Sequence, residues 1–475
     1  MVMFTALFAL VALAFAMSTL PIAVLIAALA VLKAPAWKAA IAALAVGAAE
    51  AFLWRGLSAG RLAECAVEGA ATGLYPIGLV IVAALFAYSI TEASGAIGDI
   101  KSGLSALSSD RRFLALLVAW GFGNFMEGMA GFGTAVAIPC AILVGVGFDP
   151  LRAVLCCLVA NTTPTAFGSV GVPTRVLAGE TGLQLEALTP VIAWLQLSVT
   201  AILPFLVLVA ADGLRGLREC WKLAVVASAA FVVPWLAVAQ FAGCELPDIV
   251  GGISVMAIFA LLGEHRGIDA RRQLWAWQPF AFIVAALGAT AFLPPERKPS
   301  PGFVVLAAGA VGGLCQGLSP MRLAALAVKT VRRYSLALVT ICAVLALAKI
   351  MGAAGMTQTL ADGLVASTGR WYSAVSGVVG ALGGFVTGSG TSTNVLFGAL
   401  QASVASSEAQ KLLFAAANVM GAGIGKMVCP QSIVLGCAAA GLAGRESEVM
   451  KRAIPFFAVV IVIACIVTFV RGLGT

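Results

Sequence analysis

Residues 131–134 read Gly-Phe-Gly-Thr, and residues 388–391 read Gly-Ser-Gly-Thr, so one short pattern occurs twice in the chain. An Ala-Asn pair follows each copy, with its asparagine 27 positions after the threonine, at Asn161 and Asn418. A constant offset of 257 residues separates the two threonines and the two asparagines. In both copies Gly, Pro, Asn, Ser and Thr interrupt apolar sequence. In a membrane protein this combination is typical of helix-breaking backbone around a solute site.

The composition of the chain is that of a polytopic membrane protein. Of its 475 residues, 61% are hydrophobic and 11% are charged, whereas soluble domains are near 25% charged. Residues 3–32 are too long for the apolar core of a signal peptide and lack a preceding basic segment, so we interpret them as the first membrane element. Because the connections between apolar segments are short, we expect one integral membrane domain over residues 1–475.

The net charge of +8 does not predict nucleic-acid binding. Basic residues gather between apolar segments, as at Arg215, Arg218 and Lys222, which is the positive-inside distribution of membrane proteins. The 11 cysteines include no CxxC motif and His265 is the sole histidine, so the sequence predicts no metal site and no cofactor. No Ser/His, Cys/His or HExxH arrangement favours an intramembrane enzyme.

Spanning helices need about 20 apolar residues, and we predict about 12 spans in total. The uninterrupted candidates are residues 8–32, 35–54, 72–93, 186–211, 220–242, 247–262, 274–293, 303–320, 334–352 and 453–471. Two further segments, 152–174 and 411–444, contain Asn, Gly and Pro, and we predict that each is a broken helix that crosses once.

The segments 113–147 and 372–404 each turn back at a glycine cluster. We predict that each is a re-entrant helical hairpin, with tips at Glu127–Thr134 and Thr387–Thr391. With these hairpins, every major basic cluster falls on one face, which we interpret as cytoplasmic. Both termini then lie on the other face.

The connections before the two hairpins fall on opposite faces in this topology. The sequence therefore predicts an all-α membrane protein of two inverted repeats, each with a hairpin and a broken helix. Repeat 1 covers about 72–211, linking helices cover about 220–320, and repeat 2 covers about 330–471. This is the plan of many secondary transporters.

A small anion that crosses a bilayer needs its charge compensated at mid-depth, and helix N-termini and unwound N–H groups provide this. Small residues at a hairpin turn admit a ligand, and hydroxyl groups cap the helix that follows. The predicted solute contacts in the hairpins are Gly131, Gly133, Thr134, Ser389, Gly390, Thr391, Ser392 and Asn394. The alternative is that such residues only let helices pack closely. Two copies at matched spacing favour the solute site.

The two repeated asparagines each follow an apolar helical run near Pro or Gly, as expected of an unwound segment. Each either contacts the solute or satisfies the backbone groups freed by the break. The predicted contacts in the broken helices are Asn161, Thr162, Asn418, Lys426, Gln431 and Ser432.

Charges inside apolar segments are few and informative. Glu127 lies at the predicted tip of the first hairpin, and a carboxyl group there suits a proton carrier because burial disfavours its charged form. The alternative is an interfacial or salt-bridged glutamate. Lys426 attracts a solute carboxylate, pairs with Glu127 or pairs with a backbone carbonyl. Arg175 is either a charge at the outer mouth or an interface anchor.

At these residues the chain resembles the L-lactate permease family. The matching stretches are EGMAGFG from Glu127, NTTPTAFG from Asn161, TGSGTSTN from Thr387, GKMVCPQS from Gly425 and CELPDI from Cys244. The resemblance covers nearly the whole chain. It implies a carrier of the prokaryotic cytoplasmic membrane that takes up lactate, and in some members glycolate, together with protons. It also implies kinship with inverted-repeat transporters that use an elevator motion and are often homodimers.

Three positions depart from the family's pattern. Gly390 stands where the family commonly has aspartate, and the loss of that carboxylate bears on the coupling ion or the substrate. Arg175 stands where members usually have an apolar residue. The loop at 294–301 is shorter than in several members. The added cation and the lost anion shift the site toward more negative solutes.

The leading hypothesis is proton symport of a small hydroxy-monocarboxylate: L-lactate, or D-lactate or glycolate. Glu127 carries the proton and Lys426 favours the carboxylate. The alternative is a carrier of another organic anion, a sulfonate or a dicarboxylate, with proton or sodium coupling.

Overall fold

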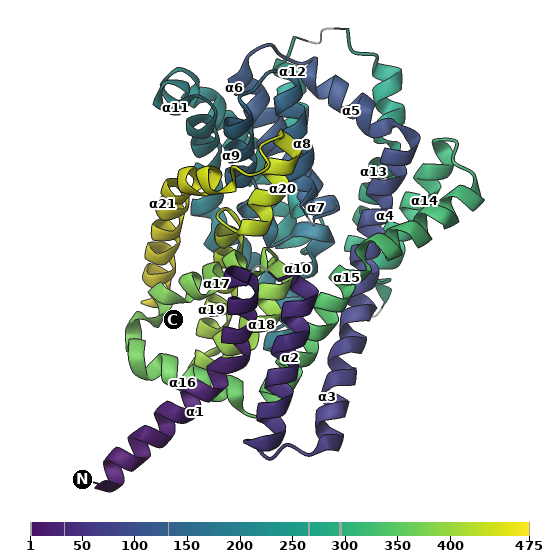
Figure 1. Cartoon of the computed structure of the whole chain (residues 1–475). Helices are drawn as coiled ribbons and strands as arrows, with labels where there is room; N and C mark the ends of the chain where they lie inside the picture. Colours follow the sequence, from purple (N-terminus) through teal and green to yellow (C-terminus); the bar gives the residue numbers. More distant parts are fainter. Residues whose placement is uncertain (1, 33, 132, 265–266, 294–296, 475) are drawn as a thin grey trace.

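The computed structural model shows an elongated bundle of helices, with the N-terminal helix projecting at the lower left of Figure 1. The described residues are 2–32, 34–131, 133–264, 267–293 and 297–474, and no strand occurs among them. Phe132 of the first glycine motif and His265 lie outside these residues, as does part of the 294–301 loop.

The elements of the first half precede the connection at residues 242–246. They are α1 (Val2–Ile26), α2 (Ala36–Leu53), α3 (Ala59–Thr72), α4 (Leu79–Ser94), α5 (Ala96–Ser105), α6 (Arg111–Leu114), α7 (Gly123–Met129), α8 (Thr134–Gly145), α9 (Pro150–Ala160), α10 (Gly168–Thr181) and α11 (Leu185–Phe241). A π-helical stretch, Ala115–Phe122, joins α6 to α7.

The second half continues with linking helices and then a further hairpin and broken helix. Its elements are α12 (Pro247–Leu262), α13 (Ala270–Ala291), α14 (Pro301–Cys315), α15 (Pro320–Ala353), α16 (Met356–Thr368), α17 (Tyr372–Thr387), α18 (Gly390–Val404), α19 (Glu408–Lys426), α20 (Pro430–Ala440) and α21 (Glu446–Gly472).

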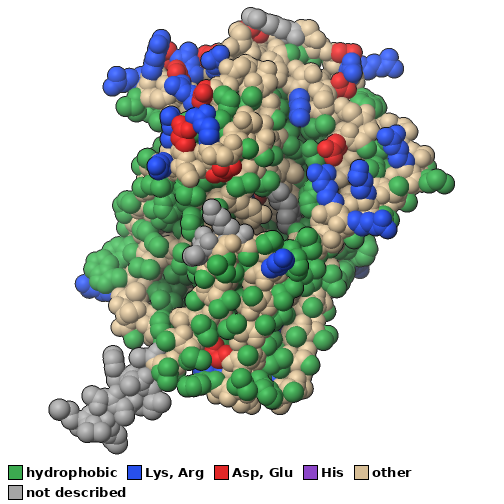
Figure 2. Space-filling view, in the orientation of Figure 1, with side chains coloured by type: hydrophobic (Ala, Val, Ile, Leu, Met, Phe, Trp, Pro, Cys, Tyr) green, Lys and Arg blue, Asp and Glu red, His purple; other side chains and the backbone are tan. Residues whose placement is uncertain are grey.

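Helix length and composition confirm the prediction of a polytopic membrane protein. Among the described residues, 7 helical stretches are long and apolar enough to cross a membrane, and shorter apolar helices accompany them. Basic side chains gather over the upper part of the molecule in the view of Figure 2, while the lower part is largely hydrophobic. This distribution agrees with basic clusters on one face.

Two predicted spans are parts of longer helices. The segment 72–93 belongs to a 36-residue helical stretch, Ala59–Ser94, that kinks at Tyr75. The segment 334–352 is the end of α15, which begins at Pro320. Hydropathy marks where a helix is apolar, whereas backbone hydrogen bonding continues through charged turns outside the apolar region.

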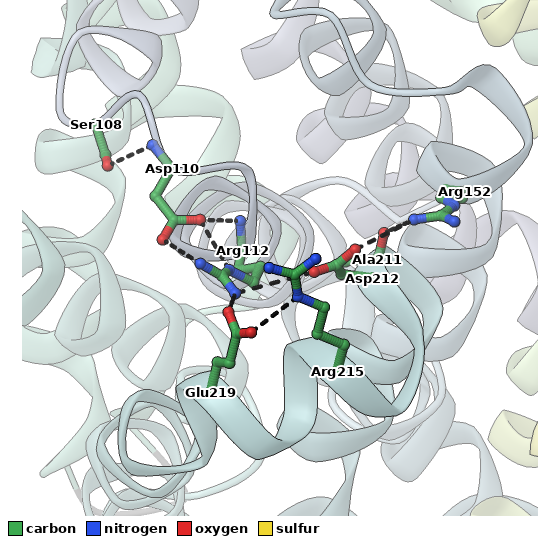
Figure 3. A network of polar contacts seen from close by, with 8 residues as sticks. All are labelled: Ser108, Asp110, Arg112, Arg152, Ala211, Asp212, Arg215 and Glu219. Carbon is green, nitrogen blue, oxygen red and sulfur yellow. Dashed lines mark hydrogen bonds and ion pairs between the residues drawn. The ribbon is translucent and has the colours of Figure 1, made fainter.

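Helix α11 joins the predicted spans 186–211 and 220–242, and an ionic network holds the bend between them (Figure 3). Arg112 of α6 bonds Asp110, at 3.2 Å from its Nε, and also Glu219 within the bend. These bonds raise the pKa of the Arg112 guanidinium above its ordinary value, so it stays charged. Arg152 at the start of α9 lies 3.5 Å from Asp212 at the bend. The network therefore ties α6, α9 and α11 together at one end of the bundle.

Both predicted hairpins form helix-turn-helix units. The first turns between the end of α7 at Met129 and the start of α8 at Thr134, and the second at residues 388–389 between α17 and α18. Gly131 and Gly388, which match at the repeat offset, are both left-handed, with φ of 62° and 64°. A side chain with a Cβ is strained there, so glycine is required at the turns.

Both predicted broken helices are interrupted, but at other places than expected. The first has breaks at residues 161–167 and 169–171, and the second has one at 427–429. The expected unwinding at Asn418 is wrong, because Asn418 lies inside α19, which remains helical to Lys426.

Close packing of α17 explains why α19 is regular around Asn418. A Cβ on Gly421 would lie 2.0 Å from the carbonyl oxygen of Gly377, and one on Gly425 would lie 2.0 Å from that of Ala381. These glycines allow the two backbones to touch, as small residues do between membrane helices. Gly421 and Gly425 therefore serve close helix packing, which is the alternative role considered above for the glycines of the hairpins.

The second arm of each hairpin packs on the broken helix of the other half. Helix α8 contacts α20, and α10 contacts α18, near the centre of the molecule in Figure 1. Asn394 of α18 donates from Nδ2 to the carbonyl oxygen of Pro173 in α10, at 2.9 Å. The thiol of Cys140 in α8 lies 3.8 Å from the carbonyl oxygen of Gly436 in α20. The two halves thus interlock around one central region.

Replacement of Gly421 by alanine is expected to separate α17 from α19. The added methyl group meets backbone that cannot rotate away, and such overpacking costs about 1–3 kcal/mol. Thermal unfolding of the purified protein in detergent should show a lower midpoint. Gly288→Ala in α13 is the matched control, since nothing lies within 4 Å of a Cβ there. Equal midpoints for the two variants would contradict the packing assigned to Gly421.

Candidate functional site

A cavity of about 150 Å³ lies where the two hairpin turns meet the two broken helices. Its volume is small beside the roughly 300–1,000 Å³ of sites for drug-sized ligands, so it suits a solute of few atoms. Several residues predicted from the sequence line it: Glu127, Gly133, Asn161, Ser389, Gly390, Thr391, Ser392, Lys426, Gln431 and Ser432. The structure therefore brings together residues from both copies of the repeated pattern.

Glu127 and Lys426 form a buried ion pair in the cavity wall. The Lys426 Nζ donates to Glu127 Oε1 at 2.7 Å, and the two side chains are 9% and 5% exposed. Glu127 lies in the last turn before the first hairpin turn, and Lys426 is the last residue before the break in the second broken helix. Of the alternatives considered for Lys426, the structure shows pairing with Glu127. Among the described residues that line the cavity, these two carry the charges.

Two polar atoms at the cavity have no hydrogen-bond partner in the described part of the chain. They are Glu127 Oε2 and Asn161 Oδ1, both buried. Buried polar atoms normally have a partner, so each unpaired one needs an explanation. Both belong to residues that line the cavity, where a solute, a proton or water can reach them.

Glycines leave space for this arrangement. A Cβ on Gly168 would lie 3.1 Å from Glu127 Cγ, so a larger residue would press on the ion pair. A Cβ on Gly390 would lie 2.5 Å from the methyl carbon of Thr165, which is buried. An aspartate at position 390 does not fit beside Thr165 without a shift of α18 or of Thr165. The packing around position 390 therefore accommodates the glycine that this chain has there and leaves no room for a side chain.

Three helices begin at the cavity. Gly133 precedes α8, Ser389 precedes α18 and accepts a hydrogen bond from the N–H of Ser392, and Gln431 lies in the first turn of α20. The N-terminus of a helix carries partial positive charge and unpaired N–H groups. The arrangement thus favours an anion in the cavity beyond the effect of Lys426.

Five predicted residues do not line the cavity. Gly131 and Thr134 shape the first turn, where the Thr134 hydroxyl donates to the Gly131 carbonyl at 2.8 Å. Thr162 is buried in the break after α9. Asn394 and Asn418 bond each other, with Asn418 Nδ2 donating to Asn394 Oδ1 at 2.9 Å. For these two asparagines the structure shows a role in packing the second hairpin against α19.

Some residues near the site were missed by sequence reasoning. Ala337 and Thr340 of α15 line the cavity from outside the hairpins, and no motif marks them. Asp248 is fully buried at the start of α12, where it accepts a hydrogen bond from Trp235 Nε1 at 2.9 Å. A Cβ on Gly128, the neighbour of Glu127, would lie 3.0 Å from Asp248 Cβ. In the sequence Asp248 is marked only by its place in the CELPDI stretch.

Comparison with known families bears on what this cavity serves. The family described as L-lactate permease matches residues 14–295 and 296–472. The chain belongs to that family. The resemblance noted in the sequence is thereby confirmed over almost its whole length.

Curated relatives of this family member carry permease names. An L-lactate permease of Streptococcus iniae is 38% identical over 390 residues, which cover 74% of this chain and 81% of that protein. An L-lactate permease of Escherichia coli (strain K12) is 33% identical, over 91% of each chain. A glycolate permease of the same organism is 31% identical, over 80% of this chain and 81% of that protein. These relatives indicate a multi-pass transporter rather than an enzyme.

Breaking the ion pair from one side is expected to destabilise the protein. Lys426→Met leaves the Glu127 carboxylate buried without its cation, which costs about 3–5 kcal/mol, whereas Glu127→Gln/Lys426→Met removes both charges and should recover most of that loss. Thermal unfolding in detergent measures both. Arg61→Gln is the control, since it breaks the exposed Arg61–Glu64 pair and should leave the midpoint unchanged. A double variant no more stable than Lys426→Met would contradict the pairing.

Proposed function

We propose that the chain is a secondary active transporter that takes up a small hydroxy-monocarboxylate by proton symport across the cytoplasmic membrane. L-lactate is the leading substrate, with D-lactate and glycolate as close candidates. The relatives' names support this substrate class. The observation that carries the proposal is the buried Glu127–Lys426 pair in a small cavity between the hairpin turns.

Charge balance in the cavity links the proton to the anion. When the cavity is empty, the Glu127 carboxylate neutralises Lys426. A monocarboxylate that binds Lys426 brings a second negative charge into a buried site, which is costly unless one charge is removed. Protonation of Glu127 removes it and frees the ammonium group for the solute. The site is then neutral both empty and loaded, with one proton carried for each anion.

Neutral groups around the pair suit the rest of a 2-hydroxy acid. The unpaired Oδ1 of Asn161 can accept a hydrogen bond from a solute hydroxyl group, and hydroxyl groups of Thr391 and Ser392 lie in the same lining. The N-termini of α8, α18 and α20 add donors for the carboxylate. Polar groups placed in this way fix the orientation of a small ligand.

The alternative substrate, a sulfonate or a dicarboxylate, was motivated by Gly390 and Arg175. Arg175 pairs with Glu245 and does not line the cavity, so it adds no free charge there. A dicarboxylate would bring one more negative charge than Lys426 balances. A sulfonate remains compatible with a single cation, and competition against lactate tests it.

The transport cycle in this proposal uses two inverted repeats. Helices α8 and α18 have 12 and 15 residues, fewer than the about 20 that cross a bilayer, which supports hairpins that turn back within the membrane. We place the repeats at about 72–211 and 330–471, with alternating access by an elevator motion, in a homodimer. Cross-linking of single-cysteine variants at the hairpin turns, with and without solute, tests the motion.

Glu127→Gln is expected to abolish coupling to protons. In proteoliposomes the native protein should accumulate L-lactate about tenfold for one unit of inward pH gradient, because one proton accompanies each anion. The variant should equilibrate lactate without accumulation, since glutamine cannot take up and release the proton. Uptake of labelled lactate measures both.

A matched control for this experiment is Glu64→Gln, which removes an exposed carboxylate on α3 and should leave accumulation unchanged. If Glu127→Gln still accumulated lactate in response to the pH gradient, the proposed carrier role would be wrong. Accumulation driven by a sodium gradient instead would favour the alternative coupling.

Removal of the ammonium group is expected to weaken solute binding more than it slows transport. In a Glu127→Gln background, which avoids an unpaired carboxylate, Lys426→Gln should raise the lactate concentration at half-maximal exchange roughly 30-fold, the equivalent of about 2 kcal/mol. Counterflow of labelled lactate measures this. An unchanged concentration dependence would leave Lys426 with a structural role alone.

A further inference from the structure

A second and larger cavity, of about 490 Å³, lies outside the site described above; we call it the vestibule. It is bordered by Arg175 of α10, by both ends of α11, by the end of α13, by the kink at Tyr75 and Pro76 before α4, and by the connections at 242–246 and 297–300. Its charged lining residues among those described are Arg175, Glu186, Glu245 and Lys298. None of them lines the smaller cavity.

The vestibule opens at the end of the bundle away from the ionic network of Arg112. Helix α11 starts beside the vestibule at Leu185 and reaches the network at Asp212, a length of roughly 40 Å at 1.5 Å per residue. Helix α13 likewise runs from Ala270 to Ala291 at the vestibule. Two helices therefore place it on the face opposite the basic clusters, which is the outer face in the proposed topology.

One turn of α10 separates the vestibule from the solute cavity. Pro173 lines the cavity, and Arg175, two residues later, lines the vestibule. Hydrogen bonds hold this turn in place: Thr174 Oγ1 donates to the carbonyl of Ala166 at 2.8 Å, and Asn394 Nδ2 donates to that of Pro173. Residues 173–175 therefore lie between the solute cavity and the vestibule, and we call them the wall.

An ion pair between Arg175 and Glu245 joins this wall to the connection before α12. Cys244 anchors that connection, because its thiol and carbonyl groups lie close to Gly171. The backbone before Glu245 is therefore held in place, whereas the Arg175 side chain is 31% exposed and lines the vestibule. Lys298 adds a second cation to the same lining.

We propose that the vestibule is an outer docking site for a small carboxylate, in which the solute displaces Glu245 from Arg175. A solute carboxylate can accept the same guanidinium hydrogen bonds that Glu245 accepts, so the exchange keeps a carboxylate beside Arg175. Arginine binds carboxylates through two parallel N–H donors, and the displaced Glu245 shares the vestibule with Lys298.

Docking at Arg175 places the anion against the wall that faces the solute cavity. It also removes the ion pair between the wall and the connection before α12. The inference rests on the proposed function for its substrate class. The binding step itself requires only Arg175 and a carboxylate.

Saturation-transfer NMR of L-lactate on the detergent-solubilised protein tests the docking site. The starting variant is Glu127→Gln/Lys426→Met, in which the inner cavity lacks both charges. We expect saturation transfer to the lactate methyl group to persist in this variant and to fall at least fivefold when Arg175→Gln is added. Addition of Glu245→Gln instead should lower the apparent Kd, because the competing carboxylate is gone. Glu186→Gln, in the same vestibule, should change neither the saturation transfer to lactate nor its apparent Kd.

Loss of the signal in the starting variant, or its persistence after Arg175→Gln, would overturn the docking site. Thermal unfolding of each variant distinguishes a binding effect from loss of structure: a purely structural pair predicts lower midpoints for Arg175→Gln and Glu245→Gln with no opposite shifts in Kd. Gradient-driven uptake by the native protein is measured separately. Its absence would contradict the proposed function without altering the result for the vestibule.

Discussion

The buried ion pair between Glu127 and Lys426 is the constraint on which the central region depends. Two charges taken out of water must compensate each other, and they do so only when their carriers are placed within hydrogen-bonding distance. The pair therefore fixes the first hairpin turn against the break in the second broken helix. Gly168 leaves room for the Glu127 side chain, and the halves interlock around the same point.

Glycine serves two different purposes around this pair. At Gly131 and Gly388 it permits the left-handed backbone of the hairpin turns. At Gly421 and Gly425 it allows α17 to touch α19, which keeps α19 straight up to Lys426. The hairpin turns line the cavity, and the packing of α17 against α19 positions the Lys426 ammonium group in the cavity wall. The two roles have different causes: the turn glycines are required by their positive φ, and the glycines of α19 are required by contact between helix backbones.

Much of this arrangement was predictable from the sequence, because polar and helix-breaking residues are conspicuous in apolar surroundings. The repeated glycine motif predicted the two hairpins, and the Asn, Gly and Pro residues within 152–174 and 411–444 predicted the broken helices. The family followed from the motifs around them. Within the site, the alternatives for Lys426 included its pairing with Glu127, which the structure shows.

Other features depend on packing between distant segments and carry no local signal. Asn418 looked like a break, yet α17 supports a regular helix there. Asp248 belongs to the CELPDI stretch and received no role from the sequence, although it is buried beside Gly128. The extent of α15 also exceeded its apolar part, because charged turns remain helical beyond the membrane region. The partner of Arg175, 70 residues along the chain, could not be inferred from spacing.

The separation of the ion pair along the chain has a consequence for biosynthesis. Glu127 and Lys426 are 299 residues apart, and ribosomes add about 5–20 residues per second. The first hairpin is therefore made roughly 15–60 seconds before its cation and before α20, which covers α8. Through that interval the nascent chain holds an unpaired carboxyl group and an uncovered helix arm, so the first half depends on the insertion machinery or on lipid until the C-terminal half arrives.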